Sequence, residues 1–175
     1  TGTKYILEYK IKDETDPMLR FPNNLFSLAW QNDKWRIWQY LNSLPRAFLV
    51  HDFIIDKDRQ KIANLIYNPK IDLSKKVILE EDFKDFDHSN LNKLNLQSNN
   101  SQVEIIKYDP NEIRFNISTD SPGFLFLSDT YYPGWKAFID GKETKIYRAN
   151  YAFRAIPVKT GIQKVVLVYD PDSFK

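Results

Sequence analysis

Short turn sequences divide the second half of the chain into segments of alternating side chains, and they constrain the fold more than any other feature. Asp140-Gly141-Lys142 is the clearest, because Asp-Gly between two apolar segments is the strongest local signal of a β-hairpin. Asp109-Pro110-Asn111 and Lys159-Thr160-Gly161 mark two more turns, the first containing a Pro that presets its own φ angle. The spacing predicts antiparallel hairpins from Gln102 onward.

Most of the predicted elements are strands. Within 112–119, the apolar residues Ile113, Phe115 and Ile117 alternate with polar ones, as in a strand with one buried face. Strands are expected at 4–10, 34–41, 46–55, 77–80, 103–108, 112–119, 123–128, 135–139, 143–148, 152–158 and 162–169.

One segment has the periodicity of a helix. Ile62 and Ile66 lie one turn apart in the segment 58–67, and Asp56 or Asp58 can cap its start. We therefore predict a mainly β protein: an antiparallel β-sandwich of several hairpins, jelly-roll-like, with one peripheral α-helix near 58–67.

The length of 175 residues fits a single domain spanning 1–175. The stretch 82–100 is polar and Asn-rich, so it reads as a linker or a long surface loop. An alternative organisation therefore has an N-terminal sub-region 1–81, a linker 82–100 and a C-terminal hairpin region 101–175. A further loop is expected at 15–24, where Pro17 and Pro22 interrupt the pattern.

Composition argues against several function classes. The 25 basic and 23 acidic side chains give a net charge of +2, without the basic excess that suggests a nucleic-acid partner. The chain has no Cys, and its two His residues, His51 and His88, have no neighbours at metal-ligand spacing, so we expect no metal. No Gly-rich phosphate loop or nucleophile motif is present, so no cofactor and no catalytic residue are predicted. No apolar run is long enough to cross a bilayer.

A block rich in aromatic, basic and Asn/Asp residues runs from 128 to 154. Aromatic rings beside such polar groups can hold a sugar, the ring stacking on its C–H face while polar groups bind its hydroxyls. The candidate glycan contacts are Asp129, Tyr131, Tyr132, Trp135, Arg148, Asn150, Tyr151 and Arg154. The competing interpretation is core packing, which we favour for Trp135 and for Trp38.

Acidic pairs are the remaining catalytic possibility, because glycoside hydrolysis uses two carboxylates. Asp140 belongs to its hairpin turn, and the run Glu80-Glu81-Asp82 is typical of a solvated face. Asp129 is expected to cap the following turn or to pair with Arg148 or Arg154 in a buried ion pair. A free-standing hydrolase is therefore the least favoured of the functions considered.

The same block resembles the C-terminal extracytoplasmic region of the YfhO-like bacterial membrane proteins. The residues that carry the resemblance are Leu127-Ser128-Asp129-Thr130-Tyr131-Tyr132-Pro133-Gly134-Trp135-Lys136, Asp140-Gly141-Lys142 and Tyr147-Arg148-Ala149-Asn150-Tyr151-Ala152-Phe153-Arg154-Ala155. Leu44-Pro45-Arg46-Ala47 resembles a further element of the family, and the two ends of the chain resemble its approaches to membrane helices. The stretch 82–100 has no counterpart.

The resemblance implies a segment of a polytopic membrane protein, located on the extracytoplasmic side of a bacterial membrane. Proteins of this family look like membrane glycosyltransferases that use lipid-linked sugars, with their chemistry in loops of the membrane bundle. The segment itself is then an accessory domain that engages glycan or cell-envelope polymer, with the envelope glycan and its own transmembrane bundle as partners. The alternative is a purely structural or protein-interaction domain that docks on that bundle or on another partner.

Overall fold

The computed structural model of the chain describes residues 3–10, 20–83 and 100–171. Most of the loop expected at 15–24 and of the linker expected at 82–100 lies outside these ranges. By their contacts the residues form two compact units, Thr1–Pro45 and Arg46–Lys175. That these two units fold together as a single domain over 1–175 stays a prediction.

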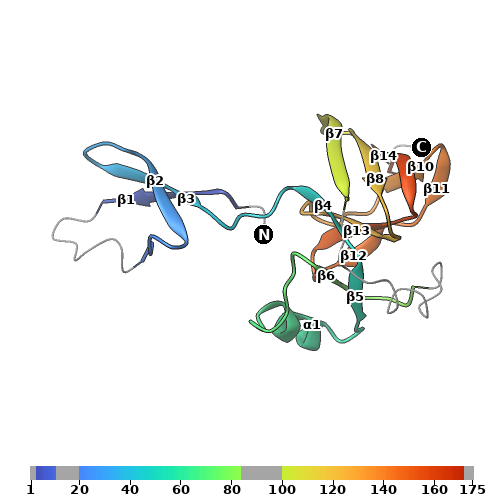
Figure 1. The fold of residues 1–175 in the computed structure, drawn as a ribbon, viewed down its shortest axis with the longest axis horizontal. Coiled ribbons are helices and arrows are strands. Elements are labelled where there is room, and N and C mark those ends of the chain that lie inside the picture. Colours follow the sequence, from blue (N-terminus) through green and yellow to red (C-terminus); the bar gives the residue numbers. More distant parts are fainter. Residues whose placement is uncertain (1–2, 11–19, 84–99, 172–175) are drawn as a thin grey trace. The chain divides into compact units, whose positions relative to one another are not determined.

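The first unit is a three-stranded antiparallel sheet (Figure 1). Its strands, in the order β1-β3-β2, are β1 (Tyr5–Tyr9), β2 (Phe26–Gln31) and β3 (Trp35–Tyr40). β1 and β3 are confirmed predictions, whereas β2 was missed. A β-bulge between Leu28 and Trp30 breaks the alternation of its side chains, which is the signal that sequence analysis relies on.

The second unit contains two sheets. Its elements are β4 (Ala47–Val50), β5 (Asp52–Ile55), α1 (Arg59–Ile66), β6 (Lys76–Leu79), β7 (Gln102–Asp109), β8 (Glu112–Thr119), β9 (Gly123–Leu127), β10 (Trp135–Ile139), β11 (Lys142–Thr144), β12 (Tyr147–Ala149), β13 (Phe153–Val158) and β14 (Gly161–Tyr169). One sheet has the order β11-β10-β14-β8-β7 and the other the order β4-β9-β13-β12-β6-β5.

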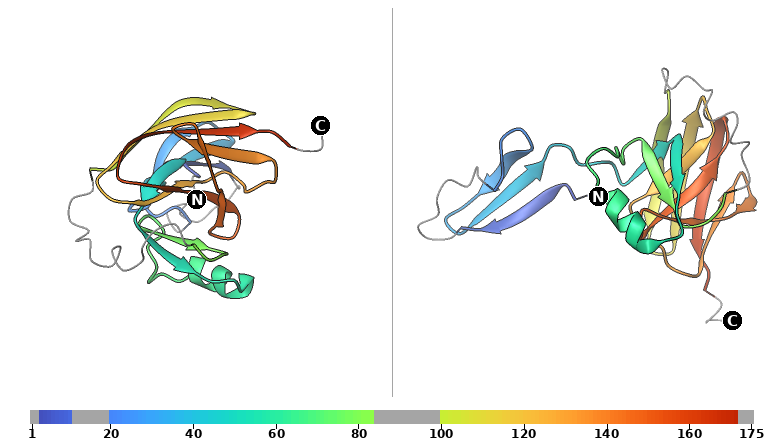
Figure 2. Two further views of the ribbon diagram at one scale, coloured as in Figure 1. Left: turned by 90° about the vertical axis from the view of Figure 1, so that its right-hand side faces the viewer. Right: turned by 90° about the horizontal axis from the view of Figure 1, so that it is seen from below.

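The two sheets pack face to face as a sandwich (Figure 2). The main core lies between them: Phe115 and Leu167 come from the five-stranded sheet, Leu125 and Ile156 from the six-stranded one. A second cluster, which includes Phe83, Phe124 and Tyr147, packs on the other face of the six-stranded sheet. The chain passes from one sheet to the other after β6, β8, β9, β11 and β13. The mainly β fold is confirmed, although the first unit forms a third sheet of its own.

The helix prediction is also confirmed. Asp58 is the N-cap of α1, and its side chain accepts hydrogen bonds from the backbone N–H groups of Gln60 and Lys61. Ile62 is fully buried. The helix connects β5 to β6, which pair in parallel (Figure 1), so the six-stranded sheet is mixed rather than wholly antiparallel.

Three predicted elements are arranged differently. The strand expected at 143–148 is two strands, β11 and β12, which lie in different sheets. The strand expected at 46–55 is two strands, β4 and β5, on opposite edges of the six-stranded sheet, because the chain leaves the sheet at His51. Lys159-Thr160-Gly161 does not close a hairpin, since β13 and β14 belong to different sheets. The Asp140-Gly141 hairpin between β10 and β11 is confirmed, with the positive φ angles, 49° and 81°, that this tight turn requires.

Candidate functional site

The aromatic block comes together at the ends of three strands of the second unit. Asp129, Tyr131 and Tyr132 lie between β9 and β10, whereas Asn150 and Tyr151 form the turn between β12 and β13. The Tyr131 backbone N–H donates to the Ala152 carbonyl at 2.7 Å and so joins these two connections. The structure therefore brings the two halves of the predicted site side by side.

Arg154 is the buried cation of this region. Its Nε donates to the Thr130 carbonyl at 2.9 Å, and its guanidinium carbon lies 4.4 Å from the centre of the Trp135 ring. Burial lowers the pKa of Arg154, while the nearby Asp129 carboxylate acts in the opposite direction. Trp135 also contacts Tyr169, with the ring centres 5.5 Å apart, so much of its indole ring is occupied by packing.

Asp129 is paired with Arg46 rather than with the expected Arg148 or Arg154. The Arg46 Nε lies 3.6 Å from Asp129 Oδ1, which also accepts a hydrogen bond from the Tyr108 hydroxyl at 2.9 Å. The Arg46 guanidinium stacks on the Tyr108 ring at 4.5 Å. The pKa of the Tyr108 phenol is raised, mainly by burial and to a smaller extent by the hydrogen bond to Asp129.

Two buried polar atoms in this cluster have no hydrogen-bond partner among the described residues. They are Asp129 Oδ2, an acceptor, and Arg154 Nη1, a donor. A hydroxyl group can donate a hydrogen bond to an acceptor such as Asp129 Oδ2 and accept one from a donor such as Arg154 Nη1.

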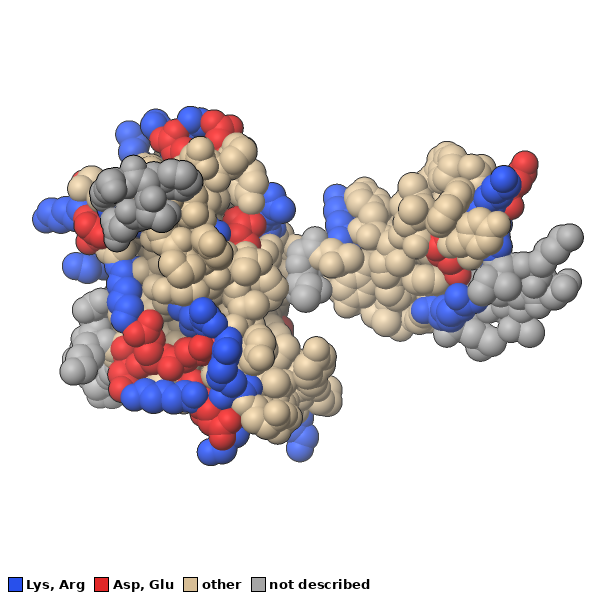
Figure 3. All heavy atoms as spheres, turned by 180° about the vertical axis from the view of Figure 1, so that it is seen from behind, with Lys and Arg blue, Asp and Glu red and all other residues tan. Residues whose placement is uncertain are grey.

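Arg148 belongs to a separate group of stacked cations. Its guanidinium lies 4.8 Å from the centre of the Tyr131 ring, and its Nε lies 3.9 Å from Glu80 Oε2. Arg59 of α1 lies at the same distance from that oxygen and 4.6 Å from the Tyr151 ring. Figure 3 shows acidic and basic side chains interspersed over the face of the second unit that it displays.

Asn150 has a structural task. Its Oδ1 accepts a hydrogen bond from the Ile78 N–H at 2.8 Å, and its own N–H donates to the Ile78 carbonyl at 2.8 Å. The side chain thus continues the six-stranded sheet toward β6. It is buried, which argues against a direct role in glycan contact.

Three of the eight predicted residues line a common pocket of about 180 Å³. We call it the Tyr132 pocket; it is lined by Tyr131, Tyr132, Pro133, Gly134, Trp135, Lys136, Glu143, Thr144, Lys145 and Ile146. Gly134 is needed there, because its φ is 95° and a Cβ atom would lie 2.9 Å from Pro171 Cβ. Three larger hollows, of about 490, 460 and 320 Å³, are lined by none of the eight predicted residues.

Several residues of the region were missed by sequence analysis. Arg46, Tyr108, Glu80 and Arg59 all contact the predicted residues, yet they lie far from the block in the sequence. Arg46 had a signal, since it belongs to the Leu-Pro-Arg-Ala element, whereas the other three had none.

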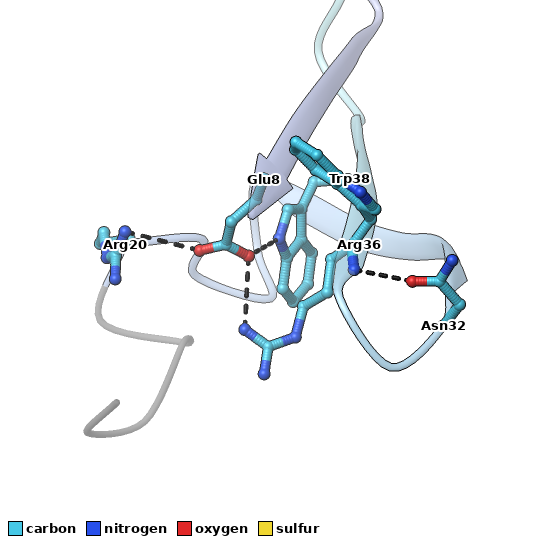
Figure 4. Close-up of polar contacts among 6 residues, drawn as sticks. Glu8, Arg20, Asn32, Arg36 and Trp38 are labelled. Carbon is cyan, nitrogen blue, oxygen red and sulfur yellow. Dashed lines mark hydrogen bonds and ion pairs between the residues drawn. The ribbon is translucent and has the colours of Figure 1, made fainter. Parts of the chain in front are cut away.

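The first unit has a polar cluster of its own (Figure 4), centred on the buried Glu8. Glu8 Oε2 accepts a hydrogen bond from Trp38 Nε1 at 2.6 Å and lies 3.4 Å from Arg36 Nη1, while Oε1 lies 3.6 Å from Arg20 Nη1. Trp38 stacks on Phe21 with ring centres 4.9 Å apart. A carboxylate thus joins β1 to β3 beneath a small aromatic core.

Neither cluster has the composition of a metal centre. Across residues 3–10, 20–83 and 100–171, no group of three or more His, Asp or Glu residues is placed to hold a metal ion. The same part of the chain contains no helix with the length and apolar character needed to cross a membrane.

Comparison with known proteins shows that the chain is similar to a family of bacterial membrane proteins. The family described as Bacterial membrane protein YfhO matches residues 68–175, a range that includes the whole aromatic block. The chain belongs to this YfhO family.

One relative is YfhO of Bacillus subtilis (strain 168), which is 28% identical over 80 residues. The matched region covers 46% of this chain but 9% of that protein. No solved structure matches the chain.

Proposed function

We propose that the second unit is an extracytoplasmic carbohydrate-engaging module of a membrane protein that transfers sugars from lipid carriers. The transfer chemistry is assigned to parts of the protein outside residues 1–175, since the matched region covers only 9% of the Bacillus subtilis relative. Family membership supports the membrane association, and the Tyr132 pocket carries the carbohydrate part of the proposal.

The pocket combines an accessible aromatic ring with polar side chains. Tyr132 is 60% exposed and offers its ring for stacking, whereas Glu143 and Thr144 supply carboxylate and hydroxyl groups to bind sugar hydroxyls. Lys145 also lines the pocket, with its ammonium bound to Glu81. A volume of about 180 Å³ is below the roughly 300–1,000 Å³ of typical small-molecule sites. A single sugar ring at the end of a glycan therefore suits it better than an extended chain.

Titration of the 1–175 protein with hexoses and N-acetylhexosamines, followed by NMR, tests the site. Binding should shift the backbone amide signals of residues 131–136, and Tyr132→Ala should weaken it about tenfold through loss of a stacking contact. Tyr67→Ala is the matched control, because Tyr67 is 86% exposed and lies outside the pocket lining. Unchanged amide signals, or equal binding by Tyr132→Ala, would contradict the proposal.

The placement outside the cytoplasm has a separate test. Residues 1–175 contain no Cys, so a single Cys at the exposed position Ile162 gives a unique label within this region. In cells that produce the entire membrane protein without its other cysteines, a membrane-impermeant maleimide should label Ile162→Cys. Labelling only after cell lysis would place the unit on the cytoplasmic side.

A structural role is the second candidate, and the stacked arginines favour it. Arg154 on Trp135, Arg148 on Tyr131 and Arg59 on Tyr151 occupy aromatic faces that a glycan would otherwise use. In this role the unit docks on its own transmembrane bundle or on a partner protein. Trp135→Ala should then lower the free energy of unfolding by about 2–4 kcal/mol. The parent protein should bind no sugar in the same titration.

A further inference from the structure

The first unit exposes a row of large aromatic and aliphatic side chains on one face of its sheet. Leu7 pairs with Ile37 and Tyr9 with Trp35 across β1 and β3, and Trp30 of β2 also pairs with Ile37. We define the aromatic face as Tyr5, Leu7, Tyr9, Trp30, Trp35 and Ile37. All of these except the half-buried Ile37 are between 37% and 61% exposed.

The bulge in β2 contributes to this face directly. Leu28 pairs with Trp38, on the opposite face, and strict alternation would place Trp30 there as well. The extra residue between them turns Trp30 to the side of Ile37. The strand irregularity thus adds a second tryptophan to the exposed side of a small sheet.

The opposite face is the packed one. It holds Trp38, which is 1% exposed, and the Glu8 carboxylate with its arginine partners. The unit therefore buries a carboxylate and exposes aromatic rings, the reverse of the arrangement that favours solubility. Exposed apolar area of this kind marks a contact surface.

Cations lie at both ends of the aromatic face. The Lys4 ammonium is 5.6 Å from the centre of the Tyr5 ring, and Lys10 and Lys34 are joined at the other end by a 2.8 Å backbone hydrogen bond. Within 3–10 and 20–45, the acidic residues are Asp33, beside Lys34, and the paired Glu8 on the opposite face. Among the described residues around the face, lysines therefore outnumber acidic side chains.

We propose that the aromatic face lies in the headgroup region of an anionic lipid bilayer. Trp and Tyr favour this region because their rings combine an apolar body with a polar edge, while lysines are attracted to anionic headgroups. Gln39 pairs with Tyr5 at one end of this face, so a glycan is kept as an outcome of the test. Two copies of the face would bring lysines together. The proposal is independent of the Tyr132 pocket.

Flotation of the 1–175 protein with vesicles tests this directly. Vesicles of phosphatidylglycerol mixed equally with phosphatidylcholine should bind the protein, phosphatidylcholine alone should bind it more weakly, and added salt should reduce the difference. Leu7→Glu should reduce partitioning by about tenfold or more, the factor expected for transfer of one leucine side chain. Ile162→Glu, at a more exposed apolar strand position in the second unit, should leave partitioning unchanged.

Two further measurements keep the test independent of folding defects. Brominated phosphatidylcholine in the mixed vesicles should quench the fluorescence of Trp30 and Trp35, and the double variant Trp30→Phe/Trp35→Phe should lose this quenching. Lys4→Glu/Lys34→Glu, which changes only exposed polar residues, should also weaken binding to the anionic vesicles.

Several results would overturn the proposal. One is a failure to float with anionic vesicles, and another is equal flotation of the protein and Leu7→Glu. Concentration-dependent dimerisation that Leu7→Glu abolishes, or quenching by a monosaccharide of Trp30 and Trp35 without vesicle binding, would assign the face to a second copy or to a glycan. Because the vesicles contain no sugar, these outcomes leave the Tyr132 pocket to its own test.

Discussion

At the scale of single residues, Asn150 meets two demands that few side chains satisfy together. Its φ angle is 46°, in the left-handed region, and its side chain accepts the Ile78 N–H. Asn150→Ala should lower the free energy of unfolding by about 2–3 kcal/mol, the sum of backbone strain and an unsatisfied donor. Asn150→Gly tolerates the backbone but loses the hydrogen bond, so about 1–2 kcal/mol is expected.

Urea denaturation of the two variants measures both contributions. The difference between Asn150→Ala and Asn150→Gly reports the backbone strain, and the loss in Asn150→Gly reports the hydrogen bond. Equal stability of Asn150→Gly and the parent protein would mean that the bond to Ile78 adds nothing.

Tyr108 should make the stability of the second unit sensitive to alkaline pH. Burial and the hydrogen bond to Asp129 raise the pKa of its phenol above the usual value of about 10. The folded state thus favours the neutral phenol. The resulting stability is fully present below about pH 10 and is lost as the pH rises through the raised pKa.

Tyr108→Phe provides the comparison. At neutral pH the variant should be less stable by about 1 kcal/mol, because it loses the donor to Asp129. Above about pH 10 the gap between the two proteins should narrow. Tyr67→Phe, at an exposed position, is the control for the loss of a tyrosine hydroxyl. A gap that stays constant to high pH would contradict this account.

At the scale of elements, local signals predicted what local interactions determine. The Asp140-Gly141 turn and the Asp58 cap were found because each depends on residues a few positions apart. β2 escaped because its bulge removes the period of two. The parallel pairing of β5 with β6 joins residues more than 20 positions apart, so no local turn sequence predicts it.

The break at His51 shows the same limit. His51 Nδ1 lies 3.0 Å from the Pro122 carbonyl oxygen, and a Cβ atom at Gly123 would come within 2.8 Å of that ring nitrogen. This close approach ends β4 and separates it from β5. In the sequence, 46–55 reads as one continuous apolar strand, because the contact that divides it comes from a distant segment.

Trp38 is expected to be the side chain that holds β1 and β3 together in the first unit. Trp38→Phe removes the donor to the buried Glu8 carboxylate as well as indole packing. The unit should lose about 1–3 kcal/mol, the cost of leaving a buried polar group less well satisfied. Hydrogen exchange should accelerate in β1 and β3 while β8 and β14 stay protected.

Trp35→Phe is the control for this prediction, since it lies on the same strand but points to the exposed face. Its effect should stay within about 0.5 kcal/mol. If the two variants exchange alike, the bond between Trp38 and Glu8 does not stabilise the sheet.

At the scale of the whole molecule, the block 127–155 identified the family because several turn and aromatic residues recur in fixed order. Its geometry could not be predicted in the same way. The cation that pairs with Asp129 comes from Arg46, at the start of the second unit, and Arg148 is held by Glu80 of another connection. Three of the eight candidate residues line a pocket, and the rest support the fold around it.

The division into two units leads to the last prediction. Among the described residues, both hydrophobic clusters of the second unit are built from residues between Ala47 and Leu167. A protein containing only residues 46–175 should therefore fold by itself, with the near-ultraviolet circular dichroism and cooperative unfolding of a packed core.

A protein of residues 51–175 is the control. It lacks β4, so it loses the buried Ala47 and Val50 and the pairing of β4 with β9. We expect it to be less stable by about 3 kcal/mol or more, because two buried side chains and an edge strand are removed. If 46–175 fails to unfold cooperatively whereas 1–175 unfolds in one transition, the two units form the single domain that the length of the chain suggested.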